Sequence, residues 1–305
     1  MNIEQSESRS ITALCSLLGF SRQAYYQHLQ QSEKEALEQE LLIQEVLLIR
    51  KDQKRLGARK LLHKMQDFIQ QHHIGIGRDS FFDLLAENGL LVRRRRRRVA
   101  RTTFSNHWLR KYPHLVVDFI PVMPNQLWVS DITYIVLENG FAYLSLITDA
   151  YSRKIVGYYL SKNLTAKGCI EALKTALQNN PERNNLIHHS DRGSQYCCGD
   201  YVKLLEKNNI GISMTQSGDP LENALAERVN GILKDELLDE EYNGFGRAQQ
   251  AVSIAINIYN HQRPHYSIDL LTPEEAHQKA GELKKRWKNY YQIQKRKEVE
   301  QIILV

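Results

Sequence analysis

The chain has 305 residues, enough for two or three domains with a substantial core. Its 42% hydrophobic and 25% charged residues are ordinary for a globular protein, and no run of about 18 apolar residues could span a membrane. The net charge of +6 is uneven, because residues 1–112 carry 20 Lys and Arg against 12 Asp and Glu, whereas residues 113–305 carry 21 against 23. A basic front half suggests contact with a polyanion.

The N-terminus and the cysteines exclude further classes of protein. The first ten residues hold no basic segment followed by an apolar core, so no secretory signal is visible and a cytoplasmic location is predicted. The four cysteines stand in neither a CxxC pair nor zinc-ligand spacing, so we expect buried, reduced thiols at Cys15, Cys169, Cys197 and Cys198.

Residues 1–50 are predicted to form an N-terminal helical domain. Residues 10–29 indicate two short helices around Gly19, with Ser21 capping the second, and an amphipathic helix over 31–50. Because Arg22 and Gln23 begin the second short helix, a DNA-binding helix-turn-helix is one interpretation. Any small helical hairpin is the other.

Residues 51–98 are predicted to form a second helix-turn-helix domain with a basic arm. A helix carrying Arg59 and Lys60 ends before Gly75 and Gly77, and a recognition helix follows over 78–88, with Arg78 and Ser80 near its start and Asn88-Gly89 as its stop. Six arginines come next, and they favour a phosphate-tracking arm over a solvated linker: Arg93, Arg94, Arg95, Arg96, Arg97 and Arg98.

After a proline-containing connector over 99–124, the pattern changes to β and predicts an α/β core over 125–280. Three antiparallel strands are expected first, the first two joined by a hairpin at Asn139-Gly140. Helices and strands then alternate, which predicts a mixed sheet with helices over 167–178, 199–207, 222–238 and 247–260. A capped helix at Thr272-Pro273-Glu274-Glu275 and a basic helix in 281–305, of open role, complete the chain.

Three carboxylates in the core suggest chemistry. Asp131 lies within the first strand, Asp191 ends the strand I-H-H-S-D, and Glu227 lies on a helix with 35 residues between it and Asp191. On that helix Asn223, Asn230 and Lys234 fall on the same face as Glu227. Three hard oxygen donors without Cys or a His cage suit Mg²⁺ or Mn²⁺, and two such ions can promote phosphoryl transfer.

Each of these acids, taken alone, is as well explained by a capping or surface role. Asp149, at a strand end beside Ser152-Arg153, is interpreted in that way, as a residue that stabilises a turn.

Six motifs run in order from about Asn125 to Ala276: W-V-S-D-I-T-Y, T-D-A-Y-S-R-K-I-V-G-Y, H-S-D-R-G-S-Q-Y, E-N-A-L-A-E-R-V-N-G-I-L-K-D-E, Y-N-H-Q-R-P-H-Y-S and L-T-P-E-E-A. This set resembles the retroviral-integrase-like core of bacterial insertion-sequence transposases, in particular the second-reading-frame product of elements with two overlapping frames. One departure is Glu222, where the family usually has Asp.

The resemblance implies an RNase H-like fold and a D-D-E triad at Asp131, Asp191 and Glu227, holding Mg²⁺ or Mn²⁺ in two sites. It implies that Lys234 contacts DNA near the cleaved end, and we extend that expectation to the neighbouring Asn223, Arg228 and Asn230. The expected partners are double-stranded DNA at the element ends and at the target, within the nucleoid, further copies of the chain, and the first-reading-frame product of the same element.

The leading hypothesis is therefore a metal-dependent transposase, in which water cuts a phosphodiester at an element end and the freed 3′-hydroxyl attacks another. A loop over 217–221 is expected to let the Glu227 helix close over DNA. Two alternatives remain: a DNA-binding regulator with an idle core, and a nuclease of the same fold that never joins strands.

Overall fold

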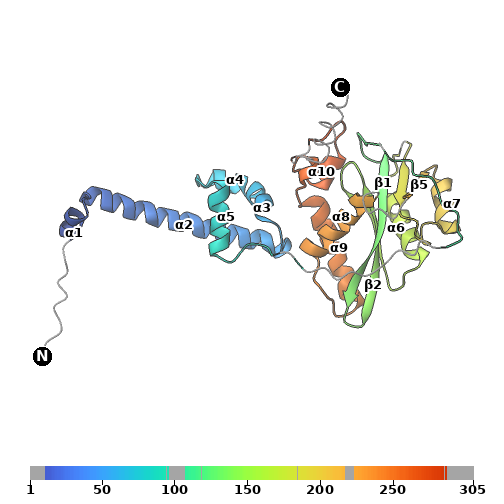
Figure 1. Cartoon of the computed structure of the whole chain (residues 1–305), viewed down its shortest axis with the longest axis horizontal. Coiled ribbons are helices and arrows are strands. Elements are labelled where there is room, and N and C mark those ends of the chain that lie inside the picture. Colours follow the sequence, from blue (N-terminus) through green and yellow to red (C-terminus); the bar gives the residue numbers. More distant parts are fainter. Residues whose placement is uncertain are drawn as a thin grey trace, which may run out of the picture. The chain divides into compact units, whose positions relative to one another are not determined.

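The computed structural model describes residues 11–93, 95, 107–117, 119–183, 185–216, 223–284 and 286, and the chain divides into two compact units, Met1–Arg93 and Arg94–Val305 (Figure 1). Several expectations lie outside the described residues: those for Arg94, Arg96, Arg97 and Arg98, the loop over 217–221, Glu222, and most of the basic C-terminal segment. No helix in the described part of the chain is long and apolar enough to cross a membrane.

The first unit is entirely helical. Its elements are α1 (Ile11–Leu17), α2 (Arg22–Asp52), α3 (Ala58–Lys64), α4 (Gln66–Gln71) and α5 (Arg78–Glu87). Ser21 caps α2 as expected, accepting a hydrogen bond from the Ala24 N–H at 3.0 Å. A separate helix over 31–50 was wrong, because no glycine or proline interrupts the chain after the cap and α2 continues as one helix of 31 residues.

A small core closes this unit. Leu42 and Val46 of α2 are buried against the three short helices, and the cluster is completed by Leu56, Leu61, Met65, Ile74, Phe81, Leu84 and Leu85. The stop after α5 is confirmed, since Asn88 is the C-cap and Gly89 takes a φ of 66° that suits glycine.

The second unit contains a five-stranded mixed sheet in the order β3-β2-β1-β4-β5. Strands β1 (Leu127–Leu137), β2 (Gly140–Asp149) and β3 (Ile155–Ser161) are antiparallel, whereas β4 (Ile187–Ser190) and β5 (Gly211–Met214) run parallel to β1. The Asn139-Gly140 hairpin is confirmed, because Leu137 pairs with Gly140, whose φ is 114°. The predicted fold, a mixed sheet flanked by helices and preceded by a helical region, is confirmed.

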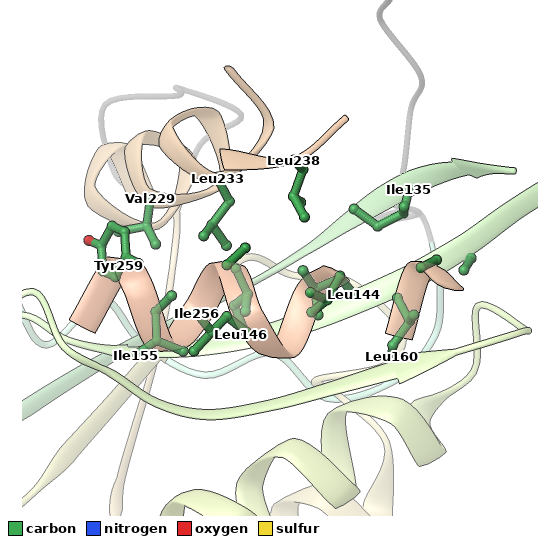
Figure 2. Packing of buried hydrophobic residues seen from close by; sticks show 14 of the residues in the cluster. Ile135, Leu144, Leu146, Ile155, Leu160, Val229, Leu233, Leu238, Ile256 and Tyr259 are labelled. Carbon is green, nitrogen blue, oxygen red and sulfur yellow. The ribbon is translucent and has the colours of Figure 1, made fainter. Parts of the chain in front are cut away.

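One face of the sheet is covered by the helices that follow it in sequence. These are α8 (Ala224–Ile232), a π-helical turn η2 (Leu233–Leu237) and α9 (Phe245–His261). Figure 2 shows Leu144, Leu146, Ile155 and Leu160 of the strands packing against side chains of these helices, among them Val229, Leu233, Ile256 and Tyr259. The helix expected over 222–238 is therefore shorter than predicted and changes its pitch at Leu233.

The other face is covered by α6 (Ala166–Asn179) and α7 (Gly199–Lys207). Helix α6 lies so close to β3 that a Cβ on Gly157 would stand 2.3 Å from the Ala172 carbonyl oxygen, so only glycine fits there. Near the end of the described chain, η3 (Tyr266–Ile268) precedes α10 (Pro273–His277), where the predicted capping box between Thr272 and Glu275 is present.

Candidate catalytic site

Asp131 and Asp191 are placed side by side by the pairing of β1 with β4. These strands are parallel and pair as far as Val129 with His189; Asp131 lies two residues beyond that pair in β1, and Asp191 directly follows the last residue of β4. Paired residues of parallel strands point to the same face, and neighbouring strands lie about 4.8 Å apart. The sheet thus brings together two acids that are distant in sequence.

The electrostatics of Asp131 reflect this proximity. Its half-buried carboxyl has a pKa raised to about 7, first by desolvation and then by the negative charge of Asp191, with a smaller contribution from Glu227. The hydrogen bonds from its own strand at the Ile132 N–H and from the Asn230 amide, 2.8 and 2.7 Å long, oppose that shift.

Asp191 is held by the turn that follows β4. Its Oδ1 accepts a hydrogen bond from the Gly193 N–H at 3.0 Å, and a Cβ on Gly193 would lie only 3.0 Å from that same oxygen. A small residue at position 193 therefore lets the turn close tightly around the carboxylate.

Glu227 lies on the exposed side of α8, and partial desolvation of its carboxyl by burial raises its pKa. Across the residues the structure describes, no three His, Cys, Asp or Glu side chains form a ready metal-binding group. Glu227 therefore has a smaller electrostatic effect on Asp131 than Asp191 has.

Two amides attach α8 to β1. Asn223, the N-cap residue, donates from Nδ2 to the Ser130 carbonyl at 3.0 Å, and Asn230 donates from Nδ2 to Asp131 Oδ2 at 2.7 Å. Both side chains are buried. The sequence suggested DNA contacts for these residues, but in the fold their amides link the Glu227 helix to the strand of Asp131.

Lys234 lies in the π-helical turn, where its Nζ is 3.6 Å from the centre of the Tyr134 ring. Arg95 donates from Nη1 to the carbonyls of Lys234 and Leu238, both at 2.8 Å, and pairs with Glu240. Arg95 was predicted to follow phosphates, and here its guanidinium instead holds the turn that carries Lys234. Arg228 is exposed on α8.

The remaining predicted DNA contacts belong to the first unit. Arg22, Gln23, Arg59, Ser80 and Arg93 are exposed, Lys60 is half-buried, and Arg78 is exposed but bonded to Asp79 at 2.8 Å. None of them belongs to the unit that carries the carboxylates.

Sequence reasoning missed a buried polar network beneath the aspartates. His188 Nε2 lies 2.6 Å from Ser130 Oγ and 2.9 Å from the Tyr201 hydroxyl, and burial lowers the pKa of this imidazole to about 3. A neutral histidine thus connects β1 to β4 one residue before Asp131. The only signal was the unusual pair of histidines in a strand, I-H-H-S.

Asp149 stabilises a turn, as predicted. It is fully buried and accepts hydrogen bonds from Ser152 N, Ser152 Oγ and Asn125 N at 2.7, 2.8 and 2.8 Å.

Sequence reasoning also missed the contacts between the connector over 99–124 and the core. Its described part packs on the core, since Leu109 and Tyr112 join the α6–α7 cluster and the Pro113 carbonyl accepts from the Met214 N–H of β5.

Comparisons with known proteins show which proteins this chain is similar to. Two family models, each described as "Integrase core domain", match residues 121–220 and 208–273. The insertion element IS600 uncharacterized 31 kDa protein of Shigella sonnei is 34% identical over 279 residues, which cover 88% of this chain and 100% of that protein.

Further relatives are matched over about half their length. The putative transposase for IS986/IS6110 of Mycobacterium tuberculosis is 33% identical, over 48% of this chain and 55% of its own. Transposase InsF for IS3A of Escherichia coli is 34% identical, over 53% and 57%. Among solved structures, the HTLV-2 integrase catalytic core domain in complex with magnesium is 19% identical with a TM-score of 0.42, over 52% of this chain and 99% of that one.

Proposed function

The chain belongs to the insertion-sequence transposases that carry an integrase core domain, and from that membership we propose that Asp131, Asp191 and Glu227 form the site at which it cuts and joins DNA strands. Proteins of this family are polynucleotidyl transferases that act on DNA. The assignment of the reaction to these three carboxylates is our inference.

The observation that carries the proposal is the proximity of Asp131, in β1, to Asp191, which follows the neighbouring parallel strand β4. The two carboxylates repel each other enough to raise the pKa of Asp131 beyond the effect of desolvation. Like charges held close enough to shift a pKa are characteristic of a functional site.

Divalent metal fits this group of donors. All three side chains offer the hard oxygen atoms that Mg²⁺ and Mn²⁺ prefer. We propose that Asp131, Asp191 and Glu227 hold two Mg²⁺ or Mn²⁺ ions. When bound, such ions supply Lewis acidity for activating a water or a 3′-hydroxyl and for stabilising the leaving oxygen.

The chain's own residues position the reaction. The Asn230 amide fixes the rotamer of Asp131 and favours its ionised form, and Asn223 holds the start of the Glu227 helix on β1. Lys234, seven residues after Glu227, supplies a cation for a DNA phosphate. Water then cleaves a P–O bond at an element end and releases a 3′-hydroxyl and a 5′-phosphate. That 3′-hydroxyl attacks phosphorus in a second strand, forming a new P–O bond and displacing the 3′-oxygen of the attacked strand.

The test supplies labelled DNA carrying the ends of the element, with Mg²⁺, and measures both 3′-end cleavage and joined product. Asp131→Asn, Asp191→Asn and Glu227→Gln should each lower both activities by at least about a thousandfold, since each removes charge that holds metal, while DNA binding persists. Glu206→Gln, on the exposed side of α7, is the matched control and should retain full activity.

Chemistry that survives in any of the three variants would refute the assignment of that residue. Cleavage by the wild-type chain without joining would make the protein a nuclease of this fold. Binding without either product would favour a regulator with an idle core.

A further inference from the structure

A short segment beside Asp191 has the composition of a nucleic-acid contact. Residues 107–112, which we call the 107–112 strip, alternate between the core and solvent. Leu109 and Tyr112 pack into the cluster beneath α6 and α7, whereas Trp108 is 92% exposed and Arg110 and Lys111 are exposed as well. An indole left almost completely in water is unusual for a side chain of this size.

The strip is fixed to the loop that carries Asp191. His107 Nε2 lies 2.9 Å from the carbonyl oxygen of Arg192, the residue that follows Asp191. The Cys197 thiol, in the same loop, is close enough to Asp191, Lys111 and Arg192 for all three charges to influence its pKa, after the larger effect of burial. Both ends of the strip are therefore close to the loop that begins at Asp191.

The composition of the strip favours a partner that carries both negative charge and aromatic rings. It contains no acidic residue, and the Arg110 guanidinium lies 5.0 Å from the Tyr112 ring centre, which holds this cation on the outer side. A flat aromatic surface beside two cations suits a nucleobase with its phosphates, because every base has a face that can stack and every backbone link carries negative charge. A base inside a duplex has both faces covered by its neighbours, so away from a blunt terminus the indole can stack only on an unpaired one.

We propose that Trp108 stacks on an unpaired base at the DNA end that is cut beside Asp191, with Arg110 and Lys111 on the adjacent phosphates. This inference rests on the proposed function, because it places the base next to the scissile phosphodiester. Stacking on the indole offsets part of the free energy lost when the terminal base pair opens, and it fixes the strand that enters the site.

Fluorescence tests the binding itself, without any chemistry. The chain has three tryptophans, of which Trp128 is buried and Trp287 lies outside the described residues. In full-length Trp287→Phe protein, Trp108 is therefore the exposed indole. Single-stranded oligothymidine should quench its emission and protect it from acrylamide, and a blunt duplex of equal length should do so far less. The signal should disappear in Trp108→Phe/Trp287→Phe.

Cleavage tests the role. On a fully paired element end Trp108→Ala should cut more slowly by on the order of tenfold, the usual effect of losing one stacked base. With the DNA saturated by protein, Trp108→Ala should cut an end with mismatched terminal bases at within about twofold of the wild-type rate, because those bases are already open before the cut. Trp108→Phe, which keeps a ring, should be intermediate, and Ile254→Ala, which alters an exposed side chain of α9, should match the wild-type chain.

The proposal is overturned if Trp108→Ala cuts the paired end at the wild-type rate, if it loses the same factor on paired and mismatched ends, or if its main effect is a change of oligomeric state, which would make Trp108 a protein contact. If the wild-type chain cuts no DNA at all, the proposed function fails. Quenching by oligothymidine would still show the stacking site, and its absence would refute it.

Discussion

Asp131 makes the stability of the chain depend on pH in an unusual direction. Its folded-state pKa of about 7 lies above the ordinary value of 3.8, so the folded chain binds this proton more tightly than the unfolded chain does. The contribution of Asp131 to stability is therefore fully present below about pH 4 and is lost as pH rises through 7.

Asp131→Asn should consequently be more stable than the wild-type chain at pH 8 in a chelator, by on the order of 1–2 kcal/mol after allowing for solvent screening. The two chains should converge near pH 4. Urea unfolding midpoints at the two pH values give the comparison. Equal stability of the two chains at pH 8 would mean that burial and neighbouring charges do not raise the pKa of Asp131.

At the scale of single residues, the sequence was a better guide to the chemistry of a side chain than to its hydrogen-bond partners. The three acids and the turn role of Asp149 could be inferred from residue type and position. The links from Asn223 and Asn230 to β1 could not, because they depend on α8 crossing β1, which no local pattern records.

Among the elements, the π-helical turn after α8 depends on an outside residue. A π turn leaves backbone carbonyls poorly satisfied, and Arg95 donates to two of them, at Lys234 and Leu238. Arg95→Ala should lower the free energy of unfolding by about 1–3 kcal/mol, the usual cost of such lost bonds.

Arg93→Ala is the matched control for this prediction, because Arg93 is exposed and belongs to the same arginine run. It should change stability by less than about 0.5 kcal/mol. Chemical denaturation of the three chains measures both values. Indistinguishable midpoints for the two variants would show that Arg95 does not support the turn.

Local patterns set the type of each element but not its length. Alternation and the hairpin signal predicted β1, β2 and their turn, and the capping box at Thr272 predicted α10. The join of two expected helices into α2 and the pitch change at Leu233 escaped prediction. In both places the outcome depends on cooperative extension or on a distant side chain, which propensity does not contain.

At the scale of the whole molecule, the positive charge of the basic front half, residues 1–112, is not spread evenly along it. Residues 1–93 carry 12 Lys and Arg against 12 Asp and Glu, whereas residues 94–112 carry eight Arg and Lys and no acid. The positive excess of the front half thus belongs to residues 94–112 and not to the helices expected to read DNA.

Arg110→Ala/Lys111→Ala should therefore reduce the slope of log affinity against log salt by about 2 for duplex DNA. Arg59→Ala/Lys60→Ala removes the same charge from the helical unit and should leave the slope nearly unchanged. Fluorescence anisotropy over a range of salt concentrations compares them. An equal reduction of the slope in both double variants would show that the helical unit contacts DNA phosphates as much as residues 110 and 111 do.

The class of fold was predictable because its pattern is long, with three strands followed by alternating helices and strands. The relation between Asp131 and Asp191 was not, since it depends on the register of two parallel strands whose pairing spans nearly 60 residues, from Val129 to His189.

The buried imidazole of His188 has a consequence for how the protein survives acid. With a pKa of about 3 the imidazole stays uncharged in conditions that already protonate Asp131, so its bonds to Ser130 and Tyr201 persist there. The link between β1 and β4 therefore outlasts the loss of charge on Asp131 when the protein is acidified.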